Sequence, residues 1–414
     1  MRELARQLVG VELISEVGWR GLTFDDLAGV GLRRNPKRAH LIVSRVLAKH
    51  VPVAGSTACD YGGLLAEAVS EALAPCSSGS QDTTLVIGFA ETACGLAGLV
   101  SDSIQGSALT HTTRDMSDRP SIWMRLNETH SHAPSHHLLG SVQRGMEACD
   151  LVVIVDDELS TGDTAWRLVR RLNEALPGRR YVVACLVDAR SEARRQWQRA
   201  QAVEMGVDLT VVALVEAEIL VPPDATERAA RVLAEHATDV VHHRTSPVGR
   251  SRLVPPLGVC FPDTRHVVSS ARRVDAFSEL APGVLEFARS HLSGRTLVLG
   301  IEEGMYTAIR VASVLGADVQ STTRSPAVVL DRPGYPLRTG ATFPSAYDPA
   351  VQGFLYNGPV VTGQPTYENV LLIHRSKDAA GPPGLPPALL AAAELCCSGT
   401  VWTLDVGAPA HGGP

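Results

Sequence analysis

The sequence predicts an α/β protein built on parallel β-sheets that are covered by helices. Apolar runs of strand length alternate with segments of helical periodicity in the first half of the chain. After a stretch rich in Arg, Pro, Ser and Gly, the same alternation starts again, which indicates a second domain of the same class. With 414 residues, of which 45% are hydrophobic and 20% charged, the chain is long enough to form two hydrophobic cores.

The individual elements follow from this alternation. In the first half, strands are expected at 84–88, 108–112, 151–155, 181–187 and 209–215. Helices are expected at 61–74, 93–102, 163–175 and 190–205. In the second half, helices are expected at 226–236, 277–291 and 306–315, and strands at 296–300, 318–322 and 369–373. We therefore expect an N-terminal segment (1–55), a first α/β domain (56–221), a connector (222–265) and a second α/β domain (266–414).

One pattern occurs in both halves. In each, a strand that ends in Gly is followed by Glu, a helical stretch and the tripeptide Thr-Thr-Arg; the residues are Gly88, Glu91 and Thr112–Arg114, then Gly300, Glu303 and Thr322–Arg324. The repeat suggests that the second domain is a degenerate copy of the first. Chance similarity is the alternative, because short strands often end in glycine.

Charge and composition exclude several classes of partner. The formal net charge of -6 gives no global positive field, so we expect neither nucleic acid nor an anionic membrane surface as a partner. The first residues mix charged and apolar side chains, unlike a signal peptide, and no apolar run is long enough to cross a bilayer. The eight cysteines are scattered without zinc-ligand spacing, which favours reduced thiols and a cytoplasmic location.

The clearest chemical signal is the segment from Asp156 to Thr164, between the apolar run 151–155 and the helical pattern that follows. Open α/β folds bind their ligands at the carboxyl ends of such strands. Hydroxyl side chains and backbone N–H groups at a helix start can bind a phosphate, since the helix dipole favours negative charge there. Gly162 lets the backbone approach such a ligand closely.

Two carboxylates beside a phosphate-binding turn suit a ligand that also carries hydroxyls and a cation. 5-Phosphoribosyl-1-pyrophosphate (PRPP) offers both: its 2- and 3-hydroxyls can donate to Asp156 and Asp157, while Mg²⁺ on its pyrophosphate tolerates their charge. The P-loop motif and the glycine-rich dinucleotide motif are both absent. The alternative interpretation of the acidic pair is a solvated turn.

This segment resembles the signature of type I phosphoribosyltransferases, and the wider order of motifs is similar to the orotate phosphoribosyltransferase branch. Residues 86–96 resemble the family's strand, pyrophosphate loop and helix, Thr112–Arg114 its next strand with a pyrophosphate-binding basic residue, and 115–139 its flexible catalytic loop. The resemblance implies a Rossmann-like sheet with a hood, formed here by the N-terminal segment. It also implies Mg²⁺-dependent transfer of the phosphoribosyl group from PRPP to an acceptor, a base or another small nucleophile, with release of pyrophosphate.

The resemblance assigns roles to these residues. Asp156 and Asp157 would bind the ribose and, indirectly, the Mg²⁺ carried by PRPP. The other expected substrate-binding residues are Glu91, Thr92, Arg114, Glu158, Ser160, Thr161, Gly162, Asp163 and Thr164. Two of them have plain alternatives, because Arg114 can be an ordinary surface arginine and Glu91 a simple helix cap.

A narrower resemblance covers most of the chain. Four motifs are similar to those of two-domain phosphoribosyltransferases encoded in bacterial tellurite-resistance and stress gene clusters; they lie at 35–40, 88–92, 128–133 and 323–326. The C-terminal domain of that family is named for its Thr-Arg-Ser-Pro (TRSP) element, which is Thr323–Pro326 here. The resemblance implies a role in a stress response and, since type I enzymes commonly share catalytic loops across a two-fold axis, a homodimer.

Three interpretations of the histidine-rich segment remain open. The segment from Glu128 to His137 holds four of the 14 histidines. As a lid over the reacting sugar, it would place Glu128, His130 and His132 as catalytic residues, since imidazole titrates near neutral pH. The other interpretations are a metal site, suggested by His-x-His near a carboxylate, and a polar surface loop.

The basic segment 33–40 is expected to belong to the hood or to a dimer contact, with solvent-facing charge as the alternative. In the second domain, Glu303, Arg324 and Ser325 form a candidate site. There the acidic pair is replaced by His374 and Arg375, so we expect this domain to bind the acceptor, an anionic product or a partner rather than to turn over PRPP. A non-catalytic sensor of PRPP or nucleotides is the second hypothesis for the whole chain.

Overall fold

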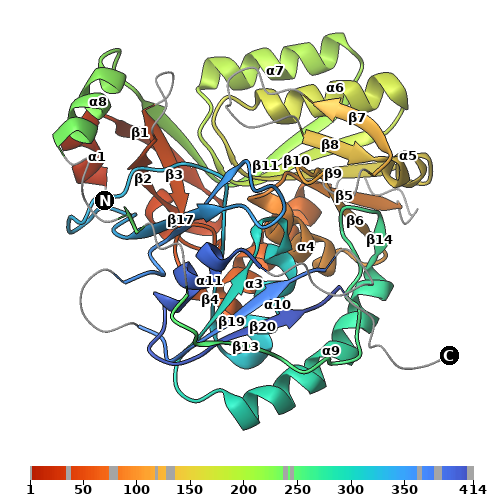
Figure 1. The fold of residues 1–414 in the computed structure, drawn as a ribbon. Helices are drawn as coiled ribbons and strands as arrows, with labels where there is room; N and C mark the ends of the chain where they lie inside the picture. The colour runs from red at the N-terminus through yellow and green to blue at the C-terminus, as the bar shows by residue number, and fades with distance from the viewer. Residues whose placement is uncertain are drawn as a thin grey trace.

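The structure, a computed structural model, describes residues 2–33, 39–73, 83–116, 120–126, 136–235, 241–242, 247–360, 366–376 and 385–407. Two sheets dominate it, and Figure 1 shows three helices between them: α3 (Gly55–Leu73), α4 (Ala93–Ser103) and α10 (Met305–Leu315). We refer to the described residues up to 242 as the first half and to those from 247 as the second half.

The first sheet has seven strands in the order β1 (Glu12–Gly18), β11 (Asp208–Leu220), β10 (Arg180–Asp188), β9 (Leu151–Leu159), β5 (Thr84–Gly88), β6 (Ala108–His111) and β14 (Val268–Ser269). The five inner strands are parallel, and the two edge strands are antiparallel to their neighbours. The helices α6 (Asp163–Ala175) and α7 (Glu192–Glu204) lie on the side of this sheet away from the second sheet (Figure 1).

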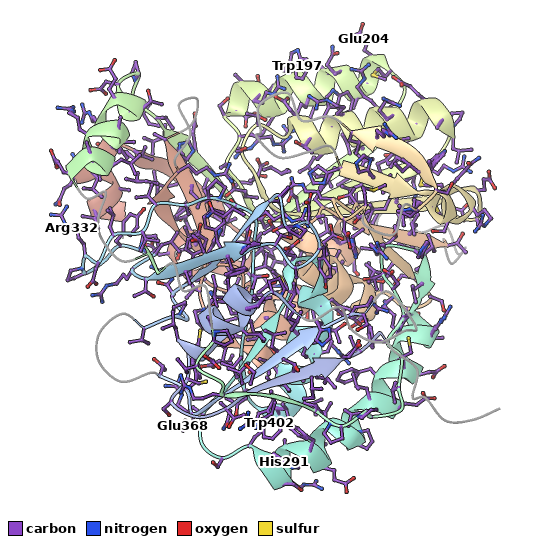
Figure 2. The ribbon with its side chains drawn as sticks, viewed as in Figure 1. Trp197, Glu204, His291, Arg332, Glu368 and Trp402 are labelled. Carbon is purple, nitrogen blue, oxygen red and sulfur yellow. The ribbon has the colours of Figure 1, made fainter. Side chains whose placement is uncertain are left out.

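The second sheet has six strands in the order β13 (Ser251–Leu253), β20 (Val401–Asp405), β19 (Asn369–His374), β15 (Thr296–Gly300), β16 (Asp318–Ser321) and β4 (Val53–Ala54). All are parallel except β4. Helix α9 (Ser270–His291) is fixed to this sheet by ring contacts, since the His291 ring lies 5.2 Å from that of Trp402 on β20 (Figure 2).

Three hairpins and five further α-helices complete the described part. The hairpins are β2 (Ala28–Leu32) with β3 (His40–Ser44), β7 (Ile122–Leu126) with β8 (His136–Leu139), and β17 (Gly340–Pro344) with β18 (Gln352–Tyr356), which β12 (Val241–His242) joins. The helices are α1 (Arg2–Val9), α2 (Phe24–Leu27), α5 (Gly140–Glu147) and α8 (Ala225–Glu235), with α11 (Pro387–Glu394) beside the second sheet. Within this part, no helix is both long and apolar enough to span a membrane.

The predicted α/β class with parallel sheets is confirmed, and so is the repeat. The strand orders β10-β9-β5-β6 and β20-β19-β15-β16 are the same, and each short antiparallel strand occupies the same edge of its sheet. These edge strands are exchanged: β4 precedes α3 of the first half but pairs with β16, whereas β14 precedes α9 of the second half but pairs with β6. The expected domain boundaries stay a prediction.

The core is continuous between the halves. Buried side chains of α10, among them Met305 and Tyr306, belong to the same apolar cluster as the facing residues of α4. This contact needs glycine, because a Cβ atom at Gly98 would lie 2.2 Å from the ring of Tyr306. The close approach of the two helices brings the carboxyl ends of both sheets to one region.

Candidate functional site

The predicted phosphate turn lies at the carboxyl end of a central strand. The expected strand 151–155 continues to Leu159, because β10 is long enough to extend the parallel ladder and pairs Asp188 with Leu159. The acidic pair is therefore still on β9, beyond the last residue that pairs with β5. Gly162 follows as the N-cap of α6, with a left-handed backbone (φ +71°).

Residues after β10 hold this turn in place. The carbonyl oxygen of Thr161 accepts hydrogen bonds from Gln198 Nε2 (3.2 Å) and Arg194 Nε (3.3 Å). A Cβ atom at Gly162 would lie 2.9 Å from Arg190 Cδ, so any other residue at this position would strain the turn and displace that side chain. The first N–H groups of an α-helix have no acceptor within the helix, and a helix start of this kind suits an anionic ligand. Here the N–H of Asp163 donates to Thr161 Oγ1 (3.3 Å).

Asp156 and Asp157 are both half-buried. The N–H of Asp157 donates to Asp156 Oδ1 at 2.9 Å. Burial, followed by the charge of Asp157, raises the pKa of Asp156 well above its usual value. A pair of this kind favours hydrogen-bond donors or a cation close by.

The predicted pyrophosphate loop directly adjoins the acidic pair. The N–H of Phe89 donates to the carbonyl oxygen of Val155 (3.1 Å), and the N–H of Ala90 donates to Thr112 Oγ1 (2.9 Å). Lys49, with 7% of its surface exposed, donates from Nζ to Thr92 Oγ1. Sequence reasoning missed Lys49, because nothing in its local pattern indicates that its segment crosses to this loop.

Arg114 lies at the side of the same loop. One guanidinium nitrogen, Nη2, lies 2.9 Å from His136 Nε2, and Nη1 lies 4.0 Å from Glu91 Oε1. Since arginine only donates, Nε2 of His136 is the acceptor, and its Nδ1 carries the proton that is donated to Thr112 Oγ1 (2.9 Å). Arg114, His136 and Thr112 thus connect the end of β6 to the pyrophosphate loop.

The second-half candidates have different hydrogen-bond partners. Glu303 is turned toward the first half, and burial raises its pKa. Arg324 pairs with Glu302, with Nη2 and Oε2 2.6 Å apart, while the carbonyl oxygen of Ser325 accepts from the hydroxyl of Tyr356. Of the contacts named here, those of Glu303 reach the first half, whereas those of Arg324 and Ser325 stay within the second half. The candidate site formed by Glu303, Arg324 and Ser325 stays a prediction.

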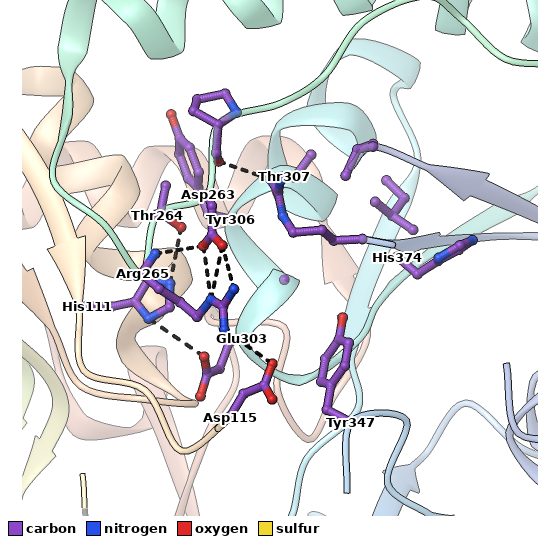
Figure 3. Close-up of a pocket in the computed structure, with 15 residues that line it drawn as sticks. His111, Asp115, Asp263, Thr264, Arg265, Glu303, Tyr306, Thr307, Tyr347 and His374 are labelled. Atoms are coloured by element: carbon purple, nitrogen blue, oxygen red, sulfur yellow. Dashed lines mark hydrogen bonds and ion pairs between the residues drawn. The ribbon is translucent and has the colours of Figure 1, made fainter. Parts of the chain in front are cut away.

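A pocket of about 60 Å³ lies where the second sheet meets the end of β6. Its walls come from both halves and include His111, Asp115, Asp263, Arg265, Glu303, Tyr347, His374 and Arg375 (Figure 3). The cations of the pocket are already engaged: Arg265 pairs with Asp263 (2.6 Å), and Arg375 donates to the carbonyl oxygen of Pro262 (3.0 Å). Although burial opposes it, the hydrogen bonds from Arg265 lower the pKa of Asp263.

Three predicted catalytic residues, Glu128, His130 and His132, lie outside the described residues. Among the residues that are described, no group of three or more His, Cys, Asp and Glu side chains is arranged to hold a metal ion.

Comparison with known proteins gives two family matches. The family described as phosphoribosyl transferase (PRTase_2) matches residues 27–218, which include the phosphate turn and the pyrophosphate loop. The family described as the TRSP domain C-terminal to PRTase_2 matches residues 263–385, which include Glu303 and Arg324. No curated protein sequence matches the chain.

Solved structures similar to the chain include two adenine phosphoribosyltransferases and a hypoxanthine phosphoribosyltransferase. The Giardia lamblia adenine enzyme is 15% identical over 46% of this chain and 94% of its own, with a TM-score of 0.29. The Trypanosoma brucei enzyme is 11% identical over 46% and 77%, with a TM-score of 0.30. The Staphylococcus aureus hypoxanthine enzyme is 13% identical over 36% and 71%, with a TM-score of 0.22.

The two family matches occur in order along the chain and together include every motif of the site that the structure describes. Residues 27–218 therefore belong to the phosphoribosyl transferase family, and residues 263–385 to the TRSP domain that follows it.

Proposed function

We propose that this phosphoribosyltransferase transfers the phosphoribosyl group of PRPP to a base or another small nucleophile and releases pyrophosphate in a Mg²⁺-dependent reaction. The observation that carries the proposal is the position of the acidic pair. Asp156 and Asp157 lie between the phosphate turn before α6 and the pyrophosphate loop after β5.

Each part of this arrangement suits one part of the donor. Asp156 and Asp157 accept hydrogen bonds from the ribose hydroxyls. The turn from Ser160 to Thr164, which includes Asp163 and follows Glu158, binds the 5-phosphate at the N-terminus of α6. Glu91 and Thr92 lie in the loop for the pyrophosphate.

Two cations lie close to that loop. Arg114 and Lys49 are positioned to stabilise the negative charge that grows on the leaving pyrophosphate. Lys49 is an addition to the residues that the sequence predicts. Glu128, His130 and His132 stay proposed as catalytic residues of the loop that would cover the sugar and exclude water.

The donor set at the acidic pair fits Mg²⁺. Carboxylate oxygens are ligands that Mg²⁺ prefers, usually together with substrate phosphates and water. The raised pKa of Asp156 indicates that the pair repels additional negative charge, which a divalent cation on the donor would offset. When bound, Mg²⁺ would supply charge neutralisation on the pyrophosphate.

Replacing the two aspartates tests the proposal. D156N/D157N keeps the size of both side chains but removes both negative charges and replaces one acceptor oxygen of each carboxylate with an NH₂ donor. We expect pyrophosphate release to fall by about 10²-fold or more while the fold is kept, because oriented contacts at the reacting sugar are lost. The measurement is release of pyrophosphate from PRPP and Mg²⁺ with a panel of bases and small amines. The exposed Asp208, replaced in D208N, is the control, and undiminished release by D156N/D157N would contradict the assignment.

A non-catalytic sensor of PRPP or nucleotides is the second candidate. It is favoured by one observation, the replacement of the acidic pair by His374 and Arg375 at the corresponding strand end of the second half. Binding of PRPP without pyrophosphate release for any acceptor would support the sensor. A role in a tellurite or stress response, a cytoplasmic location and a homodimer are proposals that rest on the resemblance alone.

A further inference from the structure

The two repeats exchange the same hydrogen bonds. The carboxylate of Glu91 accepts from Thr323 Oγ1 (3.0 Å) and from the N–H of Arg324 (2.8 Å). In the opposite direction, the carboxylate of Glu303 accepts from Thr113 Oγ1 (2.7 Å) and from the N–H of Arg114 (2.8 Å). Each half therefore holds the glutamate of the other half's loop with its own Thr-Thr-Arg element.

The relation extends to the neighbouring contacts. Thr112 Oγ1 accepts from the N–H of Ala90 within the first half, and Thr322 Oγ1 accepts from the N–H of Glu302 within the second. In each tripeptide the first threonine thus fixes its own loop, and the second threonine fixes the loop across the interface. Two unrelated surfaces in contact would not be expected to show the same hydrogen bonds in both directions.

The position of Glu91 depends on both halves. The side chain is buried, with 4% of its surface exposed, and Oε1 lies 4.0 Å from Arg114 Nη1 and 3.8 Å from Arg324 Nε. Among the described residues, Oε1 has no hydrogen-bond partner, and the hydrogen bonds that fix the carboxylate are those from the second half to Oε2. A buried carboxylate that loses a donor is costly to keep in place, because its desolvation is no longer offset.

We propose that Thr323 and Arg324 are positioning residues of the donor site, which hold Glu91 and thereby the pyrophosphate loop in its binding conformation. The TRSP element thus acts on the first half rather than at the pocket of its own sheet. This inference rests on the proposed function, since it assigns the loop 88–92 to the pyrophosphate of PRPP.

A pair of variants at Thr323 tests the inference. T323V keeps the branched shape but loses the hydroxyl that donates to Glu91, whereas T323S keeps the hydroxyl. We expect T323V to raise the Kd and KM for PRPP with Mg²⁺ about tenfold, the size expected for one hydrogen bond to a charged group, and T323S to restore both toward wild type. Thermal unfolding of each variant is measured in parallel with calorimetric titration and pyrophosphate release.

Thr403 provides the matched control. Its side chain is also buried, with 6% of the residue exposed, and its hydroxyl donates to the carbonyl oxygen of Arg252 on the second sheet. T403V should lower the Tm by a similar amount and leave the affinity for PRPP unchanged. If T323V does not fold, T323A removes the same hydroxyl without adding a methyl group in its place.

The outcomes separate the inference from the proposed function. Wild-type affinity in T323V, with a Tm loss like that of T403V, would overturn the positioning role while the transferase proposal stands. A wild-type chain that binds no PRPP would overturn both. Binding without turnover would refute the transferase proposal alone, since the titration arm of the test would still decide the positioning role.

Discussion

Glu302 is buried, with 1% of its surface exposed, at the contact between the halves. Its Oε2 accepts from Arg324 Nε at 2.6 Å, and its Oε1 accepts from the hydroxyl of Ser345. Burial, and then the charge of nearby Glu91, raise the pKa of Glu302 to about 7, although Arg324 and Ser345 oppose the shift. Below about pH 7, Glu302 therefore carries a proton within a cluster that also positions the pyrophosphate loop.

The pH dependence of stability should report this proton. Between the ordinary pKa of 4.5 and about 7, folded Glu302 keeps a proton that the unfolded chain has lost, so rising pH lowers the free energy of unfolding through this window. The contribution is about 3 kcal/mol over the window, and it is absent above about pH 7.

Chemical denaturation of wild type and E302Q from pH 4.5 to 8 measures this contribution as a difference. His111 acts in the opposite direction, since burial lowers its pKa to about 4 and stability is lost as pH falls from 6.5. His111 is present in both proteins, so its contribution cancels in the difference between them. The free energy of unfolding of wild type should fall as pH rises, and that of E302Q should lack this fall. E279Q, at an exposed site, is the control and should follow wild type. Parallel curves for wild type and E302Q would refute the assignment.

At the scale of elements, the phosphate turn depends on one glycine. Gly162 has a φ of +71°, and a Cβ atom there would lie 2.9 Å from Arg190 Cδ and 3.0 Å from Gln198 Nε2. Gly178, in the turn after α6, has a φ of +86° but no atom within 4 Å of such a Cβ. Alanine would strain the backbone at both positions, but only at Gly162 would its Cβ atom be crowded by neighbouring side chains.

G162A and G178A should therefore separate strain from crowding. Each is expected to lose about 1 kcal/mol of stability from the left-handed backbone. G162A should lose more, because Arg190 and Gln198 must move, and its affinity for PRPP should fall at least tenfold. Urea denaturation and calorimetric titration measure both effects. Equal affinities in the two variants would show that the turn does not bind the donor.

The sequence predicted apolar strands and an amphipathic helix with clear periodicity well, and other elements less well. The strands 84–88 and 296–300 and the helix 163–175 have the bounds that were expected, because polar or glycine residues delimit them. The predicted end of the strand at Val155 was wrong, because β9 continues to Leu159 through its pairing with β10. The hairpin β7–β8 was missed, because His136 and His137 give no strand pattern.

The same distinction applies to the site. The phosphate turn, with Asp156 and Asp157, could be predicted because its residues are adjacent in the sequence and their conformation depends on near neighbours. The partners of Glu91 and Arg114 do not, because Thr323 and Glu303 are far away in sequence and only the packing of the halves brings them close. Lys49 reaches Thr92 for the same reason.

At the scale of the whole molecule, the exchanged strands make the halves mutually dependent. Without the second half, β6 would present an unpaired edge, and α3 and α4 would expose the faces that pack on α10. Unpaired edges and contiguous apolar surface favour aggregation. The repeat could be predicted from the sequence, but the exchange could not, since β4 and β14 are only two residues long.

Splitting the chain between 246 and 247 tests this dependence. We expect residues 1–246 and 247–414 to aggregate when expressed separately, and to copurify in equal amounts with restored PRPP binding when expressed together.

Gly55 provides a sharper test in the split chain, because a Cβ atom there would lie 2.4 Å from the backbone nitrogen of Ser313, whereas Gly63 on the same helix has no atom within 4 Å of such a Cβ. G55A should weaken copurification of the two parts and G63A should not. The contrary outcome is that residues 1–246 are soluble alone, with native near-ultraviolet circular dichroism and full PRPP affinity. That result would show that the strand exchange is dispensable and that the second half does not hold the donor site in place.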